Sequence, residues 1–155
     1  MTVGPIDVTD PLVAARVVEI QRAAYAVEAA LIGFDGIPPL HETAADVAAL
    51  TELEWIGSHR HGTLVGIAGW SLTDDTLHID RVAVHPDFAR SGHGSALLWA
   101  IPPTQLVTVS TGRDNTPARA FYERHGFTWV GDREVVPGLL ISNYQRRKAL
   151  TDRLP

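Results

Sequence analysis

The sequence lacks cysteine altogether, and Lys148 is the only lysine among its thirteen basic residues. Without cysteine there are no disulfides, no thiolate metal ligands and no acyl-cysteine intermediate, and the composition fits a reducing compartment. No apolar run approaches the ~20 residues that a membrane-spanning helix needs. The first residues, MTVGPIDVTD, show neither the basic start nor the apolar stretch of a signal peptide. We therefore expect a cytoplasmic protein without a membrane partner.

Positive charge is also scarce, since the formal net charge is -5 at pH 7. A chain of this charge is not expected to bind nucleic acid through bulk electrostatics. His59 and His61, which lie near a predicted turn, are too sparse a pattern for a metal site, and we expect no metal. The 155 residues suffice for one hydrophobic core but not two, so we expect a single domain over residues 1–155.

The first part of the chain is predicted to hold a short strand, at residues 2–8, and two helices. Asp10 and Pro11 favour a helix start, because aspartate caps free amides and proline suits the first helical position. Gly33 ends this helix. Its apolar residues recur at spacings of three and four, which indicates a face packed on a core: Val13, Val17, Ile20, Ala24, Val27 and Leu31. Residues 34–42 are expected to form a loop, and Thr43 to open a second short helix.

The rest of the chain alternates strands with two further helices. Strands are expected at residues 53–59, 63–72, 76–84, 105–111, 127–135 and 139–147, and the first two of these form a hairpin. One helix follows residue 92 and stops at Pro102, and another runs from about residue 117 to Gly126. The order β-α-α-β-β-β-α-β-α-β-β predicts an α/β (α+β layered) domain with a mixed sheet.

A glycine-rich turn, HPDFARSGHGSALL at residues 85–98, joins a strand to a helix. Amides at a helix N-terminus are unpaired and bind anions, and glycine lets the backbone approach them. Residues 91–95 could therefore hold a phosphate, although a tight turn alone explains the glycines equally well. The lysine of a P-loop and the third glycine of a dinucleotide fingerprint are both missing.

A second segment, NTPARAFYERHGF at residues 115–127, starts a helix after a strand. We expect Thr116 to cap this helix, with Pro117 at its first position, which leaves the Asn115 amide free for another partner. Phe121 and Tyr122 point to different faces of the helix. Both could be core aromatics, but a tyrosine hydroxyl near a leaving thiolate is also a usable general acid.

Together, these two segments resemble the GNAT superfamily of CoA-dependent N-acyltransferases. The resemblance covers roughly residues 76–127 in a strand-turn-helix-strand-helix order, and it extends more loosely to both ends. It implies a mixed, mostly antiparallel sheet of about seven strands flanked by about four helices. The family usually has Arg or Gln where Ala89 stands, with Arg90 displaced by one position, and the helix after the turn is shorter here.

The resemblance implies that acetyl-CoA is the donor and that its pantetheine arm pairs with the strand at Val82 and Val84. Asn115 would contact the arm, and Tyr122 would protonate the departing sulfur. Without cysteine, direct attack by an amine in a ternary complex is the natural route. The implied cofactor-binding residues are Val82, Ala83, Val84, Ala89, Arg90, Ser91, Gly92, His93, Gly94, Ser95, Asn115, Ala118, Phe121 and Tyr122.

A general base and an acceptor site complete the expected machinery. His78 and Asp80 share one face of their strand if no bulge intervenes, and His78 is the candidate base. A water chain is the alternative. The residues expected to contact the acceptor, a small-molecule or peptide amine, are Tyr25, Glu28, Phe34 and His41. A glutamate on a helix is more often solvated, which is the alternative for Glu28.

Two other functions stay open. A nucleotide-binding module explains the glycine turn but not the second segment. A CoA-binding sensor, or a catalytically silent relative, explains both segments without turnover. The family resemblance also allows a homodimer. The identity of the amine is not predicted.

Overall fold

The computed structural model describes residues 1–148, and residues 149–155 of the predicted domain lie outside the described residues. Its centre is a seven-stranded sheet in the order β1-β2-β3-β4-β5-β7-β6. The strands are β1 (Thr2–Pro5), β2 (Glu54–Arg60), β3 (Thr63–Thr73), β4 (Thr76–Val84), β5 (Leu106–Gly112), β6 (Thr128–Val136) and β7 (Leu139–Arg147). All neighbours pair antiparallel except β4 and β5, which are parallel. The expected mixed, mostly antiparallel sheet is confirmed.

Helix α1 (Pro11–Ile32) begins and ends where its sequence signals lie. The Asp10 side chain accepts a hydrogen bond from the Leu12 amide, and Gly33 adopts φ +66° at the C-terminal cap. The expectation that the whole apolar stripe packs on a core is wrong for its last two members. Val27 and Leu31 are 52% and 45% exposed, because the last turns of α1 extend beyond the packed core and border a cavity.

Two short helices follow α1. The predicted loop over residues 34–42 contains helix α2 (Pro38–His41), because its prolines stand in the first turn, where proline is favoured. Helix α3 (Ala44–Ala48) starts at Thr43 as expected. The Thr43 hydroxyl accepts from the Asp46 amide, and the Asp46 carboxylate accepts from the Thr43 amide.

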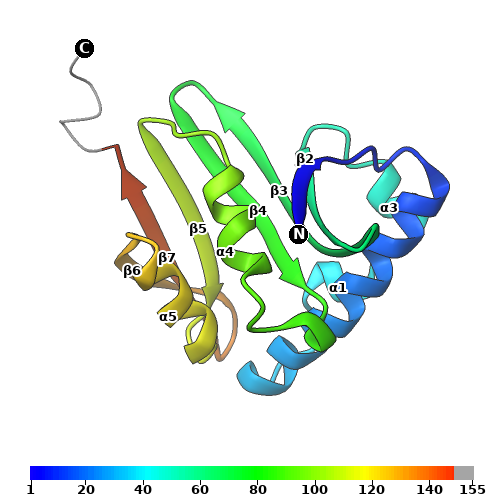
Figure 1. The fold of residues 1–155 in the computed structure, drawn as a ribbon. Coiled ribbons are helices and arrows are strands. Elements are labelled where there is room, and N and C mark those ends of the chain that lie inside the picture. The colour runs from blue at the N-terminus through cyan, green and yellow to red at the C-terminus, as the bar shows by residue number, and fades with distance from the viewer. Residues whose placement is uncertain (149–155) are drawn as a thin grey trace, which may run out of the picture.

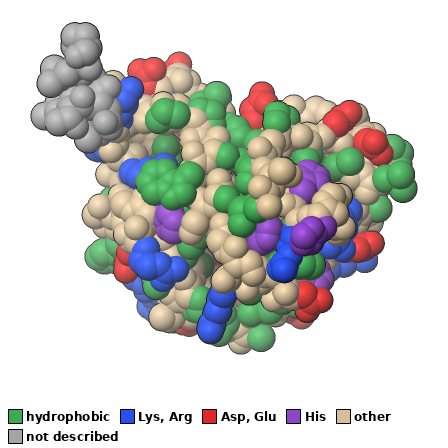
Figure 2. Space-filling view, viewed as in Figure 1, with side chains coloured by type: hydrophobic (Ala, Val, Ile, Leu, Met, Phe, Trp, Pro, Cys, Tyr) green, Lys and Arg blue, Asp and Glu red, His purple; other side chains and the backbone are tan. Residues whose placement is uncertain are grey.

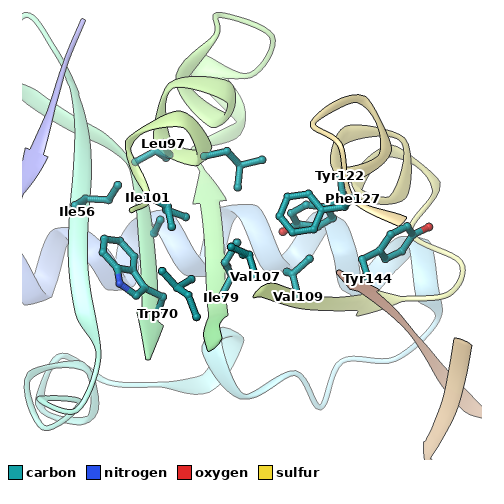
Figure 3. Close-up of a cluster of buried hydrophobic side chains, with 13 residues drawn as sticks. Ile56, Trp70, Ile79, Leu97, Ile101, Val107, Val109, Tyr122, Phe127 and Tyr144 are labelled. Atoms are coloured by element: carbon teal, nitrogen blue, oxygen red, sulfur yellow. The ribbon is translucent and has the colours of Figure 1, made fainter. Parts of the chain in front are cut away.

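The helices cover both faces of the sheet (Figure 1). Helices α4 (His93–Ala100) and α5 (Thr116–Arg124) lie on one face, and a short 3-10 turn, Pro86–Phe88, precedes α4. Helices α1 and α3 pack on the other face. In the core under α4 and α5, Tyr122 and Phe127 lie together beside Val109 (Figure 3). Within residues 1–148, none of the helices has the length and apolar character needed to cross a membrane.

The sheet opens between β4 and β5. These two strands pair only at residues 76–78 with 106–108, and then they diverge (Figure 1). A β-bulge contributes to this divergence: Gly69 of β3 pairs with Arg81 and Trp70 pairs with Ile79, so Asp80 is left unpaired. The far ends of β4 and β5 are therefore separate edges inside one sheet.

Candidate active site

The inner edge of β4 carries backbone groups that no neighbouring strand takes up. The His85 amide donates to the Val65 carbonyl at 2.8 Å, which fixes the alternation of hydrogen-bonded pairs between β3 and β4. By this alternation Ala83 bonds to β3, whereas Val82 and Val84 direct their N–H and C=O groups towards β5. Because β5 has diverged at this point, an extended ligand can add to this edge as a strand does.

A cavity of about 650 Å³ passes through the opening of the sheet. Its walls come from α1, the segment after α1, β4, β5, α5 and the β6–β7 hairpin. The predicted cofactor-binding residues that line it are Val82, Ala83, Val84, Asn115, Ala118 and Tyr122. The predicted acceptor-binding residues that line it are Tyr25, Glu28 and Phe34. The opening thus connects the two sets that the sequence had assigned to donor and acceptor.

Tyr122 comes from the buried face of α5 and is 7% exposed. Its ring packs on Phe127, with 5.5 Å between centroids, and the residue also borders the cavity. Burial raises the pKa of the Tyr122 hydroxyl far above its ordinary value, and the carboxylate of Glu28 adds to this rise. The hydroxyl therefore keeps its proton throughout the neutral range.

Asn115 caps α5, so the prediction of Thr116 as the cap is wrong by one residue. The side-chain Oδ1 of Asn115 accepts from the Ala118 amide at 3.2 Å, and Pro117 stands at the second helical position rather than the first. The cap uses only the oxygen of the Asn115 side chain. Its Nδ2 is left to donate to a ligand in the cavity that Asn115 borders.

The glycine turn lies at the start of α4, outside the cavity lining, as do residues 89–95 of the predicted set. Gly92 caps α4 with φ +85°, a conformation that favours glycine. A Cβ on Gly94 would lie 3.3 Å from the Phe121 ring, so Gly94 also allows close packing. On this face, Lys and Arg side chains in the lower half lie among some acidic side chains, and further acidic side chains lie along the upper margin (Figure 2).

His93 contributes only its backbone to the turn. Its side chain is 2% exposed and forms a hydrogen bond through Nδ1 with the Ser58 hydroxyl on β2. Burial lowers the pKa of His93, and the positive charges of Arg60 and the Met1 amino group add to the effect. The neutral ring thus fastens the start of α4 to the sheet. Phe121, also predicted to contact the cofactor, instead packs against Gly94 and His125 and does not border the cavity.

The acceptor side of the cavity gathers Tyr25, Glu28 and Phe34 but not His41. Glu28 is partly buried and accepts a hydrogen bond from the Thr111 hydroxyl of β5 at 3.4 Å, so it is not the solvated residue of the alternative interpretation. Burial raises the pKa of Tyr25, and Glu28 raises it further. His41 is exposed, and its Nε2 bonds to the Asp35 carbonyl outside the cavity.

The two strand residues proposed for the base have different surroundings. Asp80, at the bulge, borders the cavity. His78 lies outside the cavity lining and forms a 2.8 Å hydrogen bond with the Thr108 hydroxyl, where β4 and β5 are still paired. The geometry therefore favours Asp80 over His78 as the group that faces a substrate.

Arg81 belongs to the site but was not predicted from the sequence. It is 6% exposed, and its guanidinium bonds to Glu42 at 2.5 Å, to Asp80 at 2.7 Å and to Gln21 at 2.9 Å. It also lies 5.4 Å from the ring centre of Trp55. This network ties β4 to α1 and to the segment that borders the cavity. The available signal was an arginine at an alternating strand position that is otherwise taken by Leu77, Ile79 and Ala83.

The hairpin of β6 and β7 closes the far side of the cavity, and this too was not predicted. Val135, Val136, Leu139 and Ile141 line the cavity from this hairpin. Their approach depends on β7 pairing with β5 along seven residues, from Leu106–Arg147 to Gly112–Ile141. No local sequence pattern marks such a long-range contact.

Two curated proteins are similar to this chain in sequence. A Bacillus subtilis (strain 168) protein, the UPF0157 protein YqkA, is 35% identical over 143 residues, 88% of this chain and 41% of that protein. The mycothiol acetyltransferase of Stackebrandtia nassauensis is 33% identical over 97 residues, 59% of this chain and 28% of that protein. The chain thus spans less than half the length of either curated relative.

A solved structure and a family model extend the likeness. The PaiA N-acetyltransferase of Thermoplasma acidophilum, solved in complex with coenzyme A, shares the fold with a TM-score of 0.76 at 16% identity, covering 95% of this chain and 98% of that one. The model of the acetyltransferase (GNAT) domain matches residues 51–129, from just before β2 to the start of β6. The chain belongs to the GNAT family of acetyltransferases.

Proposed function

We propose that this protein is an N-acetyltransferase that transfers an acetyl group from acetyl-CoA directly to a primary amine. The observation that carries the proposal is the open edge of β4 at Val82 and Val84. This edge leads to the glycine turn at one end and borders a cavity that holds Tyr122 and Glu28.

The residues around the opening fit acetyl-CoA. The free backbone groups of Val82 and Val84 suit an extended chain of amides, and the Nδ2 of Asn115 offers a further donor. The free amides of the turn at Gly92, at the positive end of α4, suit a pyrophosphate. When bound, acetyl-CoA supplies an acyl group activated as a thioester.

Tyr122 is proposed to stabilise the departing thiolate. Its raised pKa keeps the hydroxyl protonated at the pH at which the reaction would run. Because that pKa lies above the ~8.5 of an ordinary thiol, donating a hydrogen bond is favoured over complete proton transfer. This refines the expected role of Tyr122 as the residue that protonates the sulfur.

Glu28 and Asp80 are proposed to receive the incoming amine. Both carboxylates border the cavity, and the Asp80 carboxylate is oriented by the Arg81 guanidinium at 2.7 Å. A carboxylate there binds the ammonium form and accepts its proton, directly or through water, before attack. Donor and acceptor halves open into one cavity and the chain has no cysteine, so direct attack in a ternary complex needs no covalent enzyme intermediate.

The test measures both binding and turnover. Calorimetric titration of acetyl-CoA, with ATP as a control, measures binding. Free-thiol detection during a screen of amines measures turnover. Tyr122→Phe should lower kcat by about 10²–10⁴-fold with an unchanged Kd for acetyl-CoA. Tyr144→Phe is the matched control, because the Tyr144 hydroxyl bonds to Arg119 and Glu123 and the residue does not border the cavity. Tight acetyl-CoA binding without thiol release for any amine would leave a CoA-binding sensor instead.

A further inference from the structure

The acceptor end of the cavity has an exposed apolar wall. Val27 and Leu31 on α1 and Val135 and Val136 on β6 are each between 40% and 52% exposed, and all four border the cavity. Phe34 extends this wall from the segment after α1. Large apolar side chains that remain exposed around a cavity indicate a surface that a ligand covers.

Negative charge in the cavity is limited to two carboxylates among the described lining residues, Glu28 and Asp80. Asp80 accepts a hydrogen bond from the buried Arg81 guanidinium at 2.7 Å, so it is already in contact with a positive charge, which it shares with Glu42. Within the described part of the chain Glu28 has no such partner: its neighbour is the uncharged Thr111 hydroxyl, at 3.4 Å. Among the lining carboxylates of residues 1–148, Glu28 is therefore the one that has no cationic partner to compete with an incoming ammonium group.

We propose that the acceptor is an amine with a single positive charge and an apolar body, whose ammonium binds Glu28 while its body covers the wall formed by Val27, Leu31 and Val136. This inference rests on the proposed acetyltransferase function and names its substrate class. A polyamine or another acceptor with several ammonium groups would place its second charge against the apolar side chains of this wall, and the described lining offers no carboxylate besides Glu28 and the Arg81-bound Asp80.

The position of Glu28 agrees with this orientation. Thr111 lies on β5, next to the opening where the thioester is expected, so an ammonium on Glu28 lies beside the reacting end of the cavity. Leu31 follows Glu28 by three residues on α1, about one helical turn towards the C-terminus. The body of the amine thus has an apolar path away from the reacting end.

The experiment compares heptylamine with hexane-1,6-diamine, which differ in replacing a terminal methyl group by an ammonium group. In the thiol-release assay with saturating acetyl-CoA, kcat/KM should increase by up to about fourfold for each methylene from propylamine to heptylamine. The diamine should react at least roughly tenfold less efficiently than heptylamine. Equal or better use of the diamine, or no dependence on chain length, would overturn the proposal.

A charge placed on the wall gives a second test. Val27→Glu adds a carboxylate at a half-exposed position of the wall, and it should improve use of the diamine relative to heptylamine by several-fold. Leu12→Glu is the matched control, since Leu12 is 83% exposed near the start of the same helix, away from the cavity. It should leave the preference unchanged. An equal change of preference in both variants would show a general charge effect and contradict the proposed contact.

Failure of the substrate class and failure of the catalytic function are distinguishable. Calorimetric titration of each amine into the CoA-bound protein measures the preference without turnover. If no amine is acetylated but heptylamine binds more tightly than the diamine, the proposed function falls and the apolar amine site stands. If acetylation is observed but the diamine is preferred in both assays, the function stands and the substrate class is wrong.

Discussion

Replacing Arg81 by methionine tests whether the buried ion network holds the acceptor side of the cavity. The guanidinium is 6% exposed and bonds to Glu42, Asp80 and Gln21. Methionine fills a similar volume without charge, so its main effect is to leave the Glu42 carboxylate, only 15% exposed, without a counter-charge. Removing one member of a buried ion pair costs about 3–5 kcal/mol of the free energy of unfolding.

For a protein of this size, each kcal/mol shifts the thermal midpoint by about 2–4 °C, so the midpoint should fall by roughly 6–20 °C. Urea unfolding measures the free energy directly. Arg113→Met is the control, because Arg113 lies 3.7 Å from Asp114 with both side chains about half exposed or more, and it should cost less than about 1 kcal/mol.

A second substitution distinguishes the effect of the unpaired Glu42 carboxylate from the effect of lost side-chain packing. Adding Glu42→Gln to Arg81→Met removes the uncompensated carboxylate, so the double variant should be more stable than Arg81→Met alone. Because Gln21 also bonds to the Pro39 carbonyl in the cavity wall, KM for the amine should rise in Arg81→Met. If the free energy of unfolding of Arg81→Met lies within 1 kcal/mol of that of Arg113→Met, the network does not anchor this side of the cavity.

Three further predictions follow from the turn and from the titrating groups. The pKa of His93 is lowered in the folded protein, so its contribution to the free energy of unfolding should be complete above pH 6.5 and should decrease as the pH drops below this value. Urea midpoints measured between pH 8 and pH 5 should therefore fall less steeply in His93→Asn than in the unmodified protein. Gly92→Ala should cost about 1 kcal/mol or more of stability and weaken acetyl-CoA binding in calorimetry, whereas Gly138→Ala, also at positive φ, should cost stability alone. Because the pKa of Tyr122 is raised, the profile of kcat/KM against pH should show no falling limb up to about pH 10.

The sequence predicted those parts of the fold that depend on neighbouring residues. Asp10, Pro11 and Gly33 act within one helical turn of the ends of α1, so their chemistry fixes where the helix begins and ends. The cap of α5 was misplaced by one residue because proline is compatible with more than one position in the first turn, and the Asn115 side chain competes with Thr116.

The parts that could not be predicted depend on contacts between distant segments. The bulge at Asp80 exists only in the pairing of β4 with β3, and it decides that Asp80, rather than His78, borders the cavity. Arg81 finds its partners on α1 and after α2, sixty and thirty-nine residues away along the chain. Val27 and Leu31, near the C-terminal end of α1, were predicted to be core residues because periodicity shows which face of a helix is apolar but not what covers that face.

The most direct test of the proposed function is the release of CoA thiol when acetyl-CoA and heptylamine are mixed with the protein. We expect one thiol for each acetylated amine found by mass spectrometry, with a rate that depends on Tyr122 and on Glu28. Thiol release no faster than in the absence of amine, despite tight binding of acetyl-CoA, would contradict catalysis at the opening between β4 and β5.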